Sequence, residues 1–356
     1  MMVVGVDPHK QAHTAVAADE LGRRKAQKTV RARRDGHREL IAWARQACPG
    51  GRTWAVEDVR HVAGGLVRDL LAAGEAVVFV PPKLMAGARR GGRERGTSDP
   101  IDALAVARAA LREEIALPAA RLDGPVLEVR RLGDYRDDLV AERTRVINQL
   151  RWMVHDLDPA LAPAPRSLGS ARARAKLEAG LAALPACAGR AVALSQLARV
   201  AALSAEITGL EQDLAGLVTP LVPDLLAMTG VAVLTAAKIL GEAGDIRRFT
   251  SPAAFARHDG TAPLPASSGT GDGASDGPHR LNRGGNRQLN AAIHRIALAQ
   301  ARCHPGARAL LERRGRDKHE TRKASFRALK RHLSDAVYRA LKADAWRLDD
   351  TAQHAA

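Results

Sequence analysis

The chain has 356 residues, which is enough for two or three domains that each bury a core. Apolar residues make up 46% and charged residues 26%, a balance typical of globular proteins that argues against a disordered chain. The 55 Lys and Arg exceed the 39 Asp and Glu, giving a net charge of +16. Such an excess attracts polyanions, so the charge favours a nucleic-acid-binding protein over a merely soluble, Arg-rich one.

The cysteines and the N-terminus indicate the compartment. Cys48, Cys187 and Cys303 lie far apart and form no CxxC pair, which excludes a cysteine zinc site and argues against a disulfide framework. The N-terminus lacks the basic-then-apolar layout of a signal peptide. The most apolar long stretch, around 181–210, contains charged residues and does not predict a membrane span. We therefore expect a reduced, intracellular protein.

The first 120 residues alternate strand and helix patterns. The expected elements are strands at 1–7, 13–22 and 24–32, a helix at 35–47, a strand at 53–59, a helix at 61–74, a strand at 76–81 and a helix at 99–111. This order predicts an α/β domain whose mixed sheet carries helices on its faces.

The remainder of the chain is expected to be helical. Two long helical segments, 127–157 and 191–217, flank a Pro/Gly/Ala-rich break at 158–170, and their leucines recur at roughly heptad spacing. That pattern predicts either an antiparallel helical hairpin or an intermolecular coiled coil. The expected domains are an α/β catalytic domain at 1–120, a helical arm at 121–220, a mainly α C-terminal domain at 221–347 with a loop at 259–286, and a frayed tail at 348–356.

Four acidic residues stand where strands end or helices begin: Asp7, Glu57, Asp99 and Asp102. Asp7 ends an expected strand, where its carboxylate would project from the sheet edge, and Glu57 follows another apolar run, Trp54-Ala55-Val56. Asp99 and Asp102 are three residues apart at a helix start and share one helix face. Such acids repel one another unless divalent cations neutralise them. Mg²⁺ binds a few carboxylates and keeps several waters as its other ligands. Two such ions about 4 Å apart can activate the attacking oxygen and stabilise the leaving oxygen when a phosphodiester is cleaved.

Each acid has a structural alternative when it is taken alone. An acid after a strand is usually a turn or cap residue, and Asp99 alone would suit a helix start. Asp58 competes with Glu57, although strand alternation points it to the opposite face. Together, in this order of strands and helices, the four acids favour a metal-dependent nuclease centre. Isolated histidines are more often surface or core residues, which makes three of them weaker ligand candidates: His9, His13 and His294.

Five segments in order cover nearly the whole chain: GVDPHKQAHTAVAADELG, WAVEDVRHVAGGLVRDLLAAGEAVVFVPP, TSDPIDALAVARAAL, LLAMTGVAVLTAAKILGEAGDIRRF, and SSG followed by RLNRGGNRQLNAAIHRIAL. They resemble the DEDD-type transposases of bacterial insertion sequences, a group that also contains the Piv-type DNA invertases. By this resemblance the first domain is RuvC-like, an RNase H-like fold, and the four acids occupy its acidic positions. The sequence departs from the family pattern after Glu57, where Asp58-Val59-Arg60 follow, and before the third acid, where Thr-Ser-Asp replaces Lys-Thr-Asp.

Only the family resemblance assigns a function to the serine-containing loop. A nucleophilic serine needs an activating group, and none is adjacent in sequence to Ser267 or Ser268. The family carries a nucleophilic serine directly before a glycine, and Ser268 matches that position, with Ser267 as the fallback. The resemblance implies that this serine attacks a DNA phosphodiester while metal-bound acids assist. It also implies a structured guide RNA that bridges target and donor DNA, and action in the bacterial cytoplasm at the nucleoid. Recombination joins several DNA ends, so a dimer or tetramer is expected.

The C-terminal third carries most of the net charge. Between Arg280 and Arg331, fifteen Lys and Arg face three acids, a local excess of +12 that favours a phosphate-binding surface over a merely solvated helical face. Upstream, residues 225–244 resemble a helix-hairpin-helix, whose turn offers backbone N–H groups to phosphates; two packed helices are an equal alternative. The candidate nucleic-acid contacts are Gly230, Lys238, Arg280, Arg283, Arg287, Arg313, Arg314, Arg316, Lys318, Arg322 and Lys323.

The sequence therefore predicts a DNA transposase that cleaves and rejoins strands with Mg²⁺ and a serine nucleophile. One alternative is a structure-specific endonuclease resembling a junction resolvase, which would need the four acids but not Ser268. The other is a catalytically silent nucleic-acid-binding protein that keeps the fold for architecture.

Overall fold

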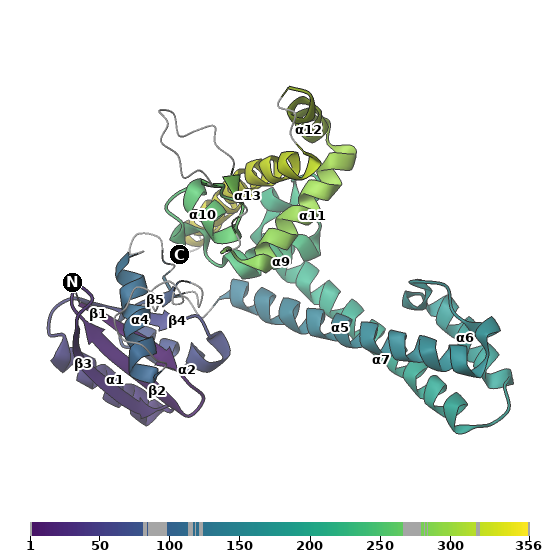
Figure 1. Ribbon diagram of the computed structural model, residues 1–356, viewed down its shortest axis with the longest axis horizontal. Helices are drawn as coiled ribbons and strands as arrows, with labels where there is room; N and C mark the ends of the chain where they lie inside the picture. Colours follow the sequence, from purple (N-terminus) through teal and green to yellow (C-terminus); the bar gives the residue numbers. More distant parts are fainter. Residues whose placement is uncertain are drawn as a thin grey trace. The chain divides into compact units, whose positions relative to one another are not determined.

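The fold is described from a computed structural model of the chain (Figure 1). The described residues are 2–80, 84, 98–112, 117, 119–120, 124–265, 279–280, 282, 284–317 and 321–354. The chain divides into two compact units. Unit 1 comprises 1–124, 245–290 and 330–339, and unit 2 comprises 125–244, 291–329 and 340–356. Among the described residues, no helix combines the length and apolarity that crossing a membrane requires.

Unit 1 contains a five-stranded mixed sheet. Its strands are β1 (Met2–Pro8), β2 (Ala12–Ala18), β3 (Arg24–Arg31), β4 (Arg52–Glu57) and β5 (Ala76–Val80), in the order β3-β2-β1-β4-β5. The pairs β1–β2 and β2–β3 are antiparallel, as expected for strands joined by short connections, whereas β4 and β5 run parallel to β1. The predicted mixed sheet is confirmed.

Helices cover both faces of this sheet (Figure 1). Helices α1 (Arg34–Ala47) and α2 (Arg60–Ala72) pack on one face, and α4 (Asp99–Arg112) packs on the other. The alternation of side chains along β1 explains the two layers. Val4 and Val6 belong to the core beneath α1 and α2, whereas Val3 belongs to the core beneath α4.

The contact between β1 and α4 is unusually close at Gly5. A Cβ atom at this position would lie 2.2 Å from the carbonyl oxygen of Ala103 and 2.5 Å from the backbone nitrogen of Ala107. Both helix residues are alanines, so small side chains on α4 and no side chain on β1 allow the two backbones to approach. This approach matters for the site because α4 begins at Asp99, one turn before Ala103.

Unit 2 contains a helical hairpin. Helix α5 (Pro125–Leu157) packs along α7 (Ala188–Leu221), and α6 (Ala171–Ala183) lies between them in sequence and packs on α7 (Figure 1). Leu139 packs with Leu203 and Ile207 in one buried cluster, and a second cluster lies around Leu150. The two long helices are therefore partners within one chain, which is the hairpin alternative of the two predicted arrangements.

The rest of the chain is mainly helical, as predicted. Its elements are α8 (Pro223–Leu226), α9 (Val233–Ala243), α10 (Pro252–Asp259), the short strands β6 (Leu264–Pro265) and β7 (His279–Arg280), α11 (Arg287–Cys303), α12 (Pro305–Asp317) and α13 (Arg322–His354). The pairing of β6 with β7 was not predicted. Helix α13 continues to His354, so the tail expected from residue 348 is helical up to that point.

We predict that Gly5→Ala destabilises unit 1 by about 2–3 kcal/mol or more, because overpacking of a closed contact costs about that much. The added methyl group would have to push α4 away from β1. Gly50→Ala is the matched control, since a Cβ there meets nothing within 4 Å. Urea unfolding followed by circular dichroism should show a lower midpoint for Gly5→Ala and little change for Gly50→Ala; equal midpoints would contradict the prediction.

Candidate metal centre

Two of the predicted acids end neighbouring strands of the sheet. Asp7 lies near the end of β1 and Glu57 ends β4. The two strands are parallel with Val6 opposite Val56, so Asp7 and Glu57 follow as the next pair in register. Because parallel strands carry their carboxyl ends to one edge of a sheet, the two acids reach the same edge. The Asp7 side chain is only 6% exposed.

The same two acids lie on the sheet face that α4 covers. Val3 and Ala55 both belong to the core beneath α4. Side chains two residues apart on a strand share a face, which places Asp7 with Val3 and Glu57 with Ala55. Helix α4 then brings Asp99 and Asp102 to this face, because both lie in its first turn. The three elements β1, β4 and α4 therefore carry the four predicted acids to one end of the sheet.

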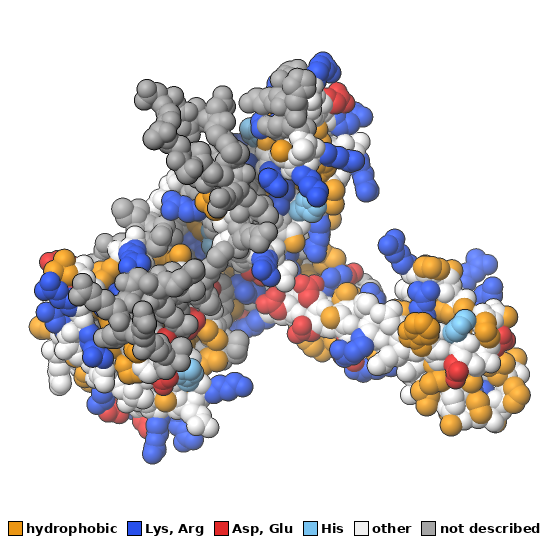
Figure 2. Space-filling view, viewed as in Figure 1, with side chains coloured by type: hydrophobic (Ala, Val, Ile, Leu, Met, Phe, Trp, Pro, Cys, Tyr) orange, Lys and Arg blue, Asp and Glu red, His pale blue; other side chains and the backbone are white. Residues whose placement is uncertain are grey.

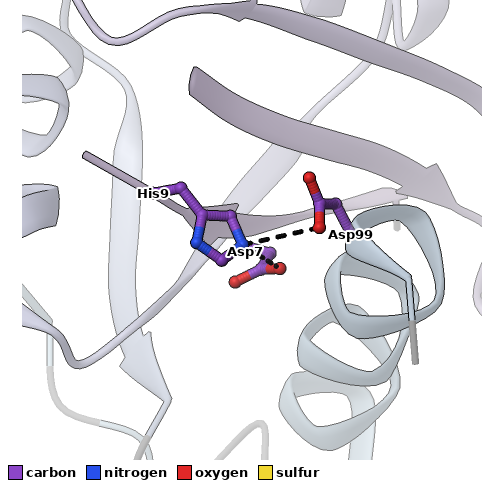
Figure 3. A group of neighbouring side chains, drawn as sticks. All are labelled: Asp7, His9 and Asp99. Atoms are coloured by element: carbon purple, nitrogen blue, oxygen red, sulfur yellow. Dashed lines mark hydrogen bonds and ion pairs between the residues drawn. The ribbon is translucent and has the colours of Figure 1, made fainter. Parts of the chain in front are cut away.

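His9 joins two of these acids directly. Its Nε2 atom lies 3.2 Å from Asp7 Oδ2 and 3.5 Å from Asp99 Oδ1, so the imidazole stands between the two carboxylates (Figure 3). One ligand atom from each of Asp7, His9 and Asp99 falls within a 4.8 Å cluster. From its sequence context, His9 is predicted to be only a weaker ligand candidate. Its spacing of two residues from Asp7 was the available signal, since that spacing keeps both side chains on one side of an extended segment.

The electrostatics of Asp7 show that the acids influence one another. Burial raises the pKa of the Asp7 carboxyl above its ordinary value, the nearby His9 lowers this pKa, and the carboxylates of Asp102 and Asp99 raise it again. Like charges held this close disfavour full ionisation. A divalent cation would relieve the repulsion, and carboxylate oxygens are the ligands that hard cations prefer. The donor set therefore fits a divalent metal ion.

The four predicted acids differ in how close they lie to one another in the structure. Asp7 and Asp99 lie within one cluster of ligand atoms, and Asp102 is close enough to raise the pKa of Asp7. Glu57 stands at the adjacent strand end, outside the cluster of ligand atoms found among the described residues. Asp58 follows β4 rather than continuing it, and its backbone N–H donates to the Val80 carbonyl at 2.9 Å.

The predicted serines, Ser267 and Ser268, lie outside the described residues, as do Arg283 and Lys318 and the side chain of Arg280. The residues on either side of the serine loop are described, and several hydrogen bonds join them. Asn290 Nδ2 donates to the Asp259 carbonyl at 2.7 Å, and the Asn286 N–H donates to the His258 carbonyl at 2.6 Å. The two ends of the loop are therefore held side by side.

A buried carboxylate anchors this loop base. Asp259 is fully buried, and its Oδ2 accepts a hydrogen bond from the Ser334 hydroxyl at 2.5 Å while its Oδ1 accepts one from the Thr261 N–H at 2.7 Å. Burial raises the pKa of Asp259 to about 6, against the lowering effect of these hydrogen bonds. Lys330 donates to the Asn290 side chain at 2.5 Å and completes a polar network beneath the loop.

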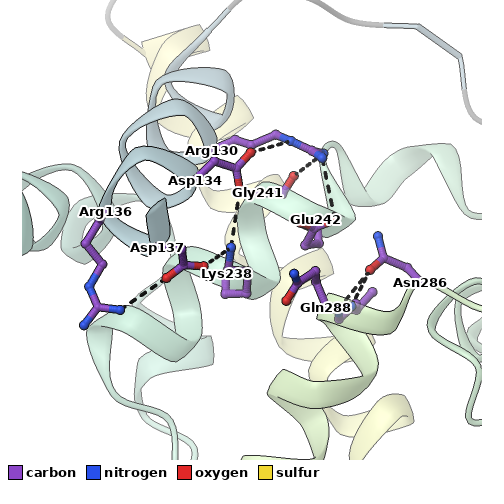
Figure 4. Close-up of polar contacts among 10 residues, drawn as sticks. Arg130, Asp134, Arg136, Asp137, Lys238, Gly241, Glu242, Asn286 and Gln288 are labelled. Carbon is purple, nitrogen blue, oxygen red and sulfur yellow. Dashed lines mark hydrogen bonds and ion pairs between the residues drawn. The ribbon is translucent and has the colours of Figure 1, made fainter. Parts of the chain in front are cut away.

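Lys238, a predicted phosphate contact, is already paired in unit 2. Its ammonium lies 2.7 Å from Asp137 and 3.3 Å from Asp134, and its side chain is 11% exposed (Figure 4). Burial opposes the charge, but the hydrogen bonds and charges of the two aspartates raise the pKa of Lys238 above its ordinary value. These contacts give Lys238 a structural role, holding α9 against α5, which the sequence did not indicate.

Gly230 also has a packing role. It adopts a φ of +86°, and a Cβ there would lie 2.9 Å from the Ala299 side chain on α11. The turn between α8 and α9 is thus pressed against α11.

The basic C-terminal helices present charge to solvent. Figure 2 shows Lys and Arg side chains gathered around α11 and α12. Arg314 is half-buried, whereas five of the predicted contacts are exposed: Arg287, Arg313, Arg316, Arg322 and Lys323.

Comparisons with known proteins agree along the chain. Residues 4–159 match a family described as Transposase, the DEDD transposases of the IS110 type, and residues 223–312 match the family described as Transposase IS116/IS110/IS902. The chain belongs to the DEDD-type insertion-sequence transposases. A 42 kDa protein of insertion element IS900 from Mycobacterium paratuberculosis is 27% identical over 359 residues, covering 87% of this chain and 88% of that protein.

Two further proteins are similar over shorter stretches. A 44.8 kDa protein of insertion element IS116 from Streptomyces clavuligerus is 35% identical over 162 residues, covering 44% of this chain and 39% of that protein. The structure of T. thermophilus RuvC in complex with Holliday junction substrate matches with 17% identity and a TM-score of 0.27, covering 34% of this chain and 99% of that chain.

Membership of this family makes the chain a DNA transposase, and its DNA-binding character follows from the family. The acidic centre described above is of the kind that uses divalent metal ions. The transposase thus carries an acidic centre within a chain whose net charge is strongly positive.

A buried histidine lies on β2, next to the strand that carries Asp7. His13, on β2, is 1% exposed and stacks on His37 with ring centroids 5.3 Å apart; His37 in turn contacts Asp69 at 2.6 Å. Burial, with smaller contributions from the neighbouring His37 and His9, lowers the pKa of His13 to about 4. Folding therefore favours the neutral imidazole.

We predict that the sheet loses stability as the pH falls from about 6.5 to about 4. The unfolded chain takes up a proton on His13 before the folded chain does, and the difference amounts to up to about 3 kcal/mol. Hydrogen–deuterium exchange of β1 and β2 peptides, corrected for intrinsic pH effects, should show faster opening at pH 5 than at pH 7. His13→Gln should reduce this difference, whereas the exposed His155→Gln should retain it; the reverse pattern would contradict the prediction.

Proposed function

We propose that this transposase cleaves and rejoins DNA strands at a Mg²⁺ centre formed by Asp7, Glu57, Asp99 and Asp102, with Ser268 as the nucleophile. The observation that carries the proposal is the convergence of β1, β4 and α4 at one sheet end. This convergence brings Asp7 and Asp99 into one ligand cluster and places Asp102 near enough to perturb Asp7. When bound, Mg²⁺ would supply Lewis-acid stabilisation of charge on the phosphate oxygens.

The chain's own groups have distinct tasks in this proposal. Asp7 is buried and lies near His9, Asp99 and Asp102, so it is the fixed member of the centre. Asp99 is 54% exposed, so it faces the side from which DNA can enter. His9 lies between them, and an imidazole is a weaker ligand for Mg²⁺ than a carboxylate. We assign His9 to orient the two carboxylates through its hydrogen bond to Asp7 and its contact with Asp99.

In the first covalent step, the Ser268 Oγ–P bond forms while the P–O bond of one DNA strand breaks. The serine hydroxyl gives up its proton and the departing deoxyribose oxygen takes one up, so the step consumes no net proton. The phosphoserine diester keeps the energy of the broken bond. Attack by a different deoxyribose hydroxyl reverses the step, joins the strands and frees the serine. The hydrogen bonds of Asp259 with Asn290 and Ser334 support this role, because they hold the residues on either side of the serine loop in place.

The proposal includes partners. Recombination joins several DNA ends, so we propose that the transposase works as a dimer or tetramer. We further propose that a structured guide RNA pairs with donor and target DNA, and that the protein acts at the nucleoid in the bacterial cytoplasm. The exposed arginines of α12 and α13 support polyanion binding.

The two alternatives differ in which residues they need. A structure-specific endonuclease would depend on the acids and not on Ser268. A silent binding protein would depend on neither group of residues and would keep its affinity for DNA.

We predict that Asp7→Asn and Glu57→Gln each lower cleavage of element-end DNA at least about a hundredfold, because each removes a charge that holds the metal. Asp58→Asn is the matched control for Glu57→Gln, since it changes the neighbouring acid outside the strand. Cleavage is measured on labelled element-end DNA with Mg²⁺ and the flanking transcript supplied. Full activity in Asp7→Asn would exclude the acidic centre as the site of cleavage. Equal losses of activity in Asp58→Asn and Glu57→Gln would show that the assignment of Glu57 to this centre is wrong.

We predict that Ser268→Ala abolishes both strand joining and the covalent protein–DNA adduct, while Ser267→Ala retains them. The adduct is detected as a protein-linked labelled strand that survives denaturation and disappears on protease treatment. Cleavage that persists in Ser268→Ala would support the endonuclease instead. No cleavage or adduct in any protein, with DNA binding intact, would support the silent binder.

A further inference from the structure

A second basic segment lies in the first domain, far in sequence from the C-terminal helices. Between Arg23 and Arg45, nine Lys and Arg face only Asp35 and Glu39, a net charge of +7. This excess and the +12 between residues 280 and 331 together exceed the +16 of the whole chain. The rest of the protein is therefore slightly acidic in net charge, so the net positive excess comes from these two segments.

The first of these segments includes the edge strand of the sheet. β3 is the outermost strand, and Val30 points into the core beneath α1 and α2. Alternation places Thr29 and Arg31 on the opposite face, where the Thr29 hydroxyl bonds to Thr14 at 2.9 Å. Helix α4 packs on β1, β2, β4 and β5 on this face. Thr29 and Arg31 are both exposed, so the face that carries Asp7 continues sideways onto an open strand.

The strand register places this open edge beside the acidic centre. Asp7 pairs with Thr14, and Thr14 pairs with Thr29. Arg31 pairs with Ala12 two residues further along the strands, just beyond the end of β1. Two strand spacings, about 10 Å, therefore separate Arg31 from β1. One DNA strand carries a phosphate about every 3.4 Å of duplex axis, so a strand held at the acids passes Arg31 within about three nucleotides.

The basic surface continues from β3 into α1. The Ala32 N–H donates to the Gln11 carbonyl at 2.9 Å, which fixes the connection after β3 against the loop that follows β1. Arg33 precedes α1 and Arg34 begins it. Arg38 lies one turn further along the same helix face. With Arg45, Arg34 and Arg38 line a groove between α1 and α2.

These arginines are available for a ligand. Arg31, Arg33, Arg34 and Arg38 are exposed, and among the described residues no acidic side chain pairs with any of them. Other basic residues of the same segment are engaged: Lys28 pairs with Glu39 at 2.7 Å and Lys25 with Asp19 at 3.2 Å. Arg31, Arg33 and Arg34 thus lie around the end of β3 that adjoins the acidic centre, and Arg38 lies one turn further along α1, which packs on the opposite face of the sheet.

We propose that Arg31, Arg33, Arg34 and Arg38, the β3–α1 basic surface, bind the phosphodiester backbone of the DNA that enters the acidic centre. The identity of the occupant rests on the proposed function, because that function brings DNA to Asp7. A guanidinium can bind a phosphate through two parallel hydrogen bonds, which suits a surface that grips a backbone. Backbone contacts carry no direct sequence information, so the surface positions DNA rather than selecting it.

The test compares two triple variants that remove the same charge from different places. The first is Arg31→Gln/Arg33→Gln/Arg34→Gln. The control is Arg145→Gln/Arg172→Gln/Lys176→Gln, which changes three exposed residues of the helical arm. Binding of a fluorescent DNA duplex is measured by anisotropy over a series of KCl concentrations, in EDTA. Without divalent metal the result depends on neither the metal centre nor Ser268, so its failure is distinguishable from failure of the proposed catalysis.

We expect the β3–α1 variant to bind DNA roughly 10–100-fold more weakly near 0.15 M salt, with a salt slope smaller by about 2–3, because each lost phosphate contact removes about 0.9. Hydrogen–deuterium exchange should show DNA-dependent protection of residues 24–40 in the wild type only. Equal losses in the arm control would overturn the proposal, since charge alone would then explain them. The proposal would also be overturned if the β3–α1 variant bound an RNA hairpin of equal length more weakly than the wild type does but bound DNA equally well. Unchanged circular dichroism confirms that the variant is folded.

Discussion

The close approach of α4 to β1 at Gly5 is the constraint on which the acidic centre of unit 1 depends. Strand β1 carries Asp7, and α4 carries Asp99 and Asp102 in its first turn. The separation of the two backbones sets how far the carboxylates lie from one another. With a side chain at residue 5 the helix would have to lie further out, since a Cβ would already be 2.2 Å from a helix carbonyl. The packing contact at Gly5 therefore determines the geometry of the acidic centre.

The acidic centre and the basic surfaces have opposite effects on folding and on binding. Burial, together with the nearby carboxylates of Asp102 and Asp99, raises the pKa of Asp7, so a negative charge at this position is costly in the absence of a cation. A chain with net positive charge draws polyanions towards it, and the acids by themselves would repel the same phosphates. Bound cations would reconcile the two, because they would turn the acids into a local site for phosphate oxygens.

Sequence patterns predicted the sheet and the long helices because alternation and helical periodicity report directly on burial. Asp7 and Glu57 could be placed at one sheet edge because each follows an apolar run. Other features depend on tertiary contacts that no local pattern carries. His9 looked like an isolated histidine until α4 brought Asp99 to its other side. Lys238 looked like a free phosphate ligand, but Asp134 and Asp137 lie about one hundred residues earlier in the chain.

The Asp259 network illustrates a similar limit at the base of the serine loop. Burying a carboxylate is unfavourable, and the pKa of about 6 shows that its hydrogen bonds do not fully offset the loss of water. An apolar residue at this position would avoid that cost, but it could not accept the N–H of Thr261 and the hydroxyl of Ser334 together. Those two groups come from the start of the loop and from α13. The carboxylate therefore fixes the loop's origin to a helix far away in sequence, a rigidity that a serine acting on a metal-centred phosphate would require.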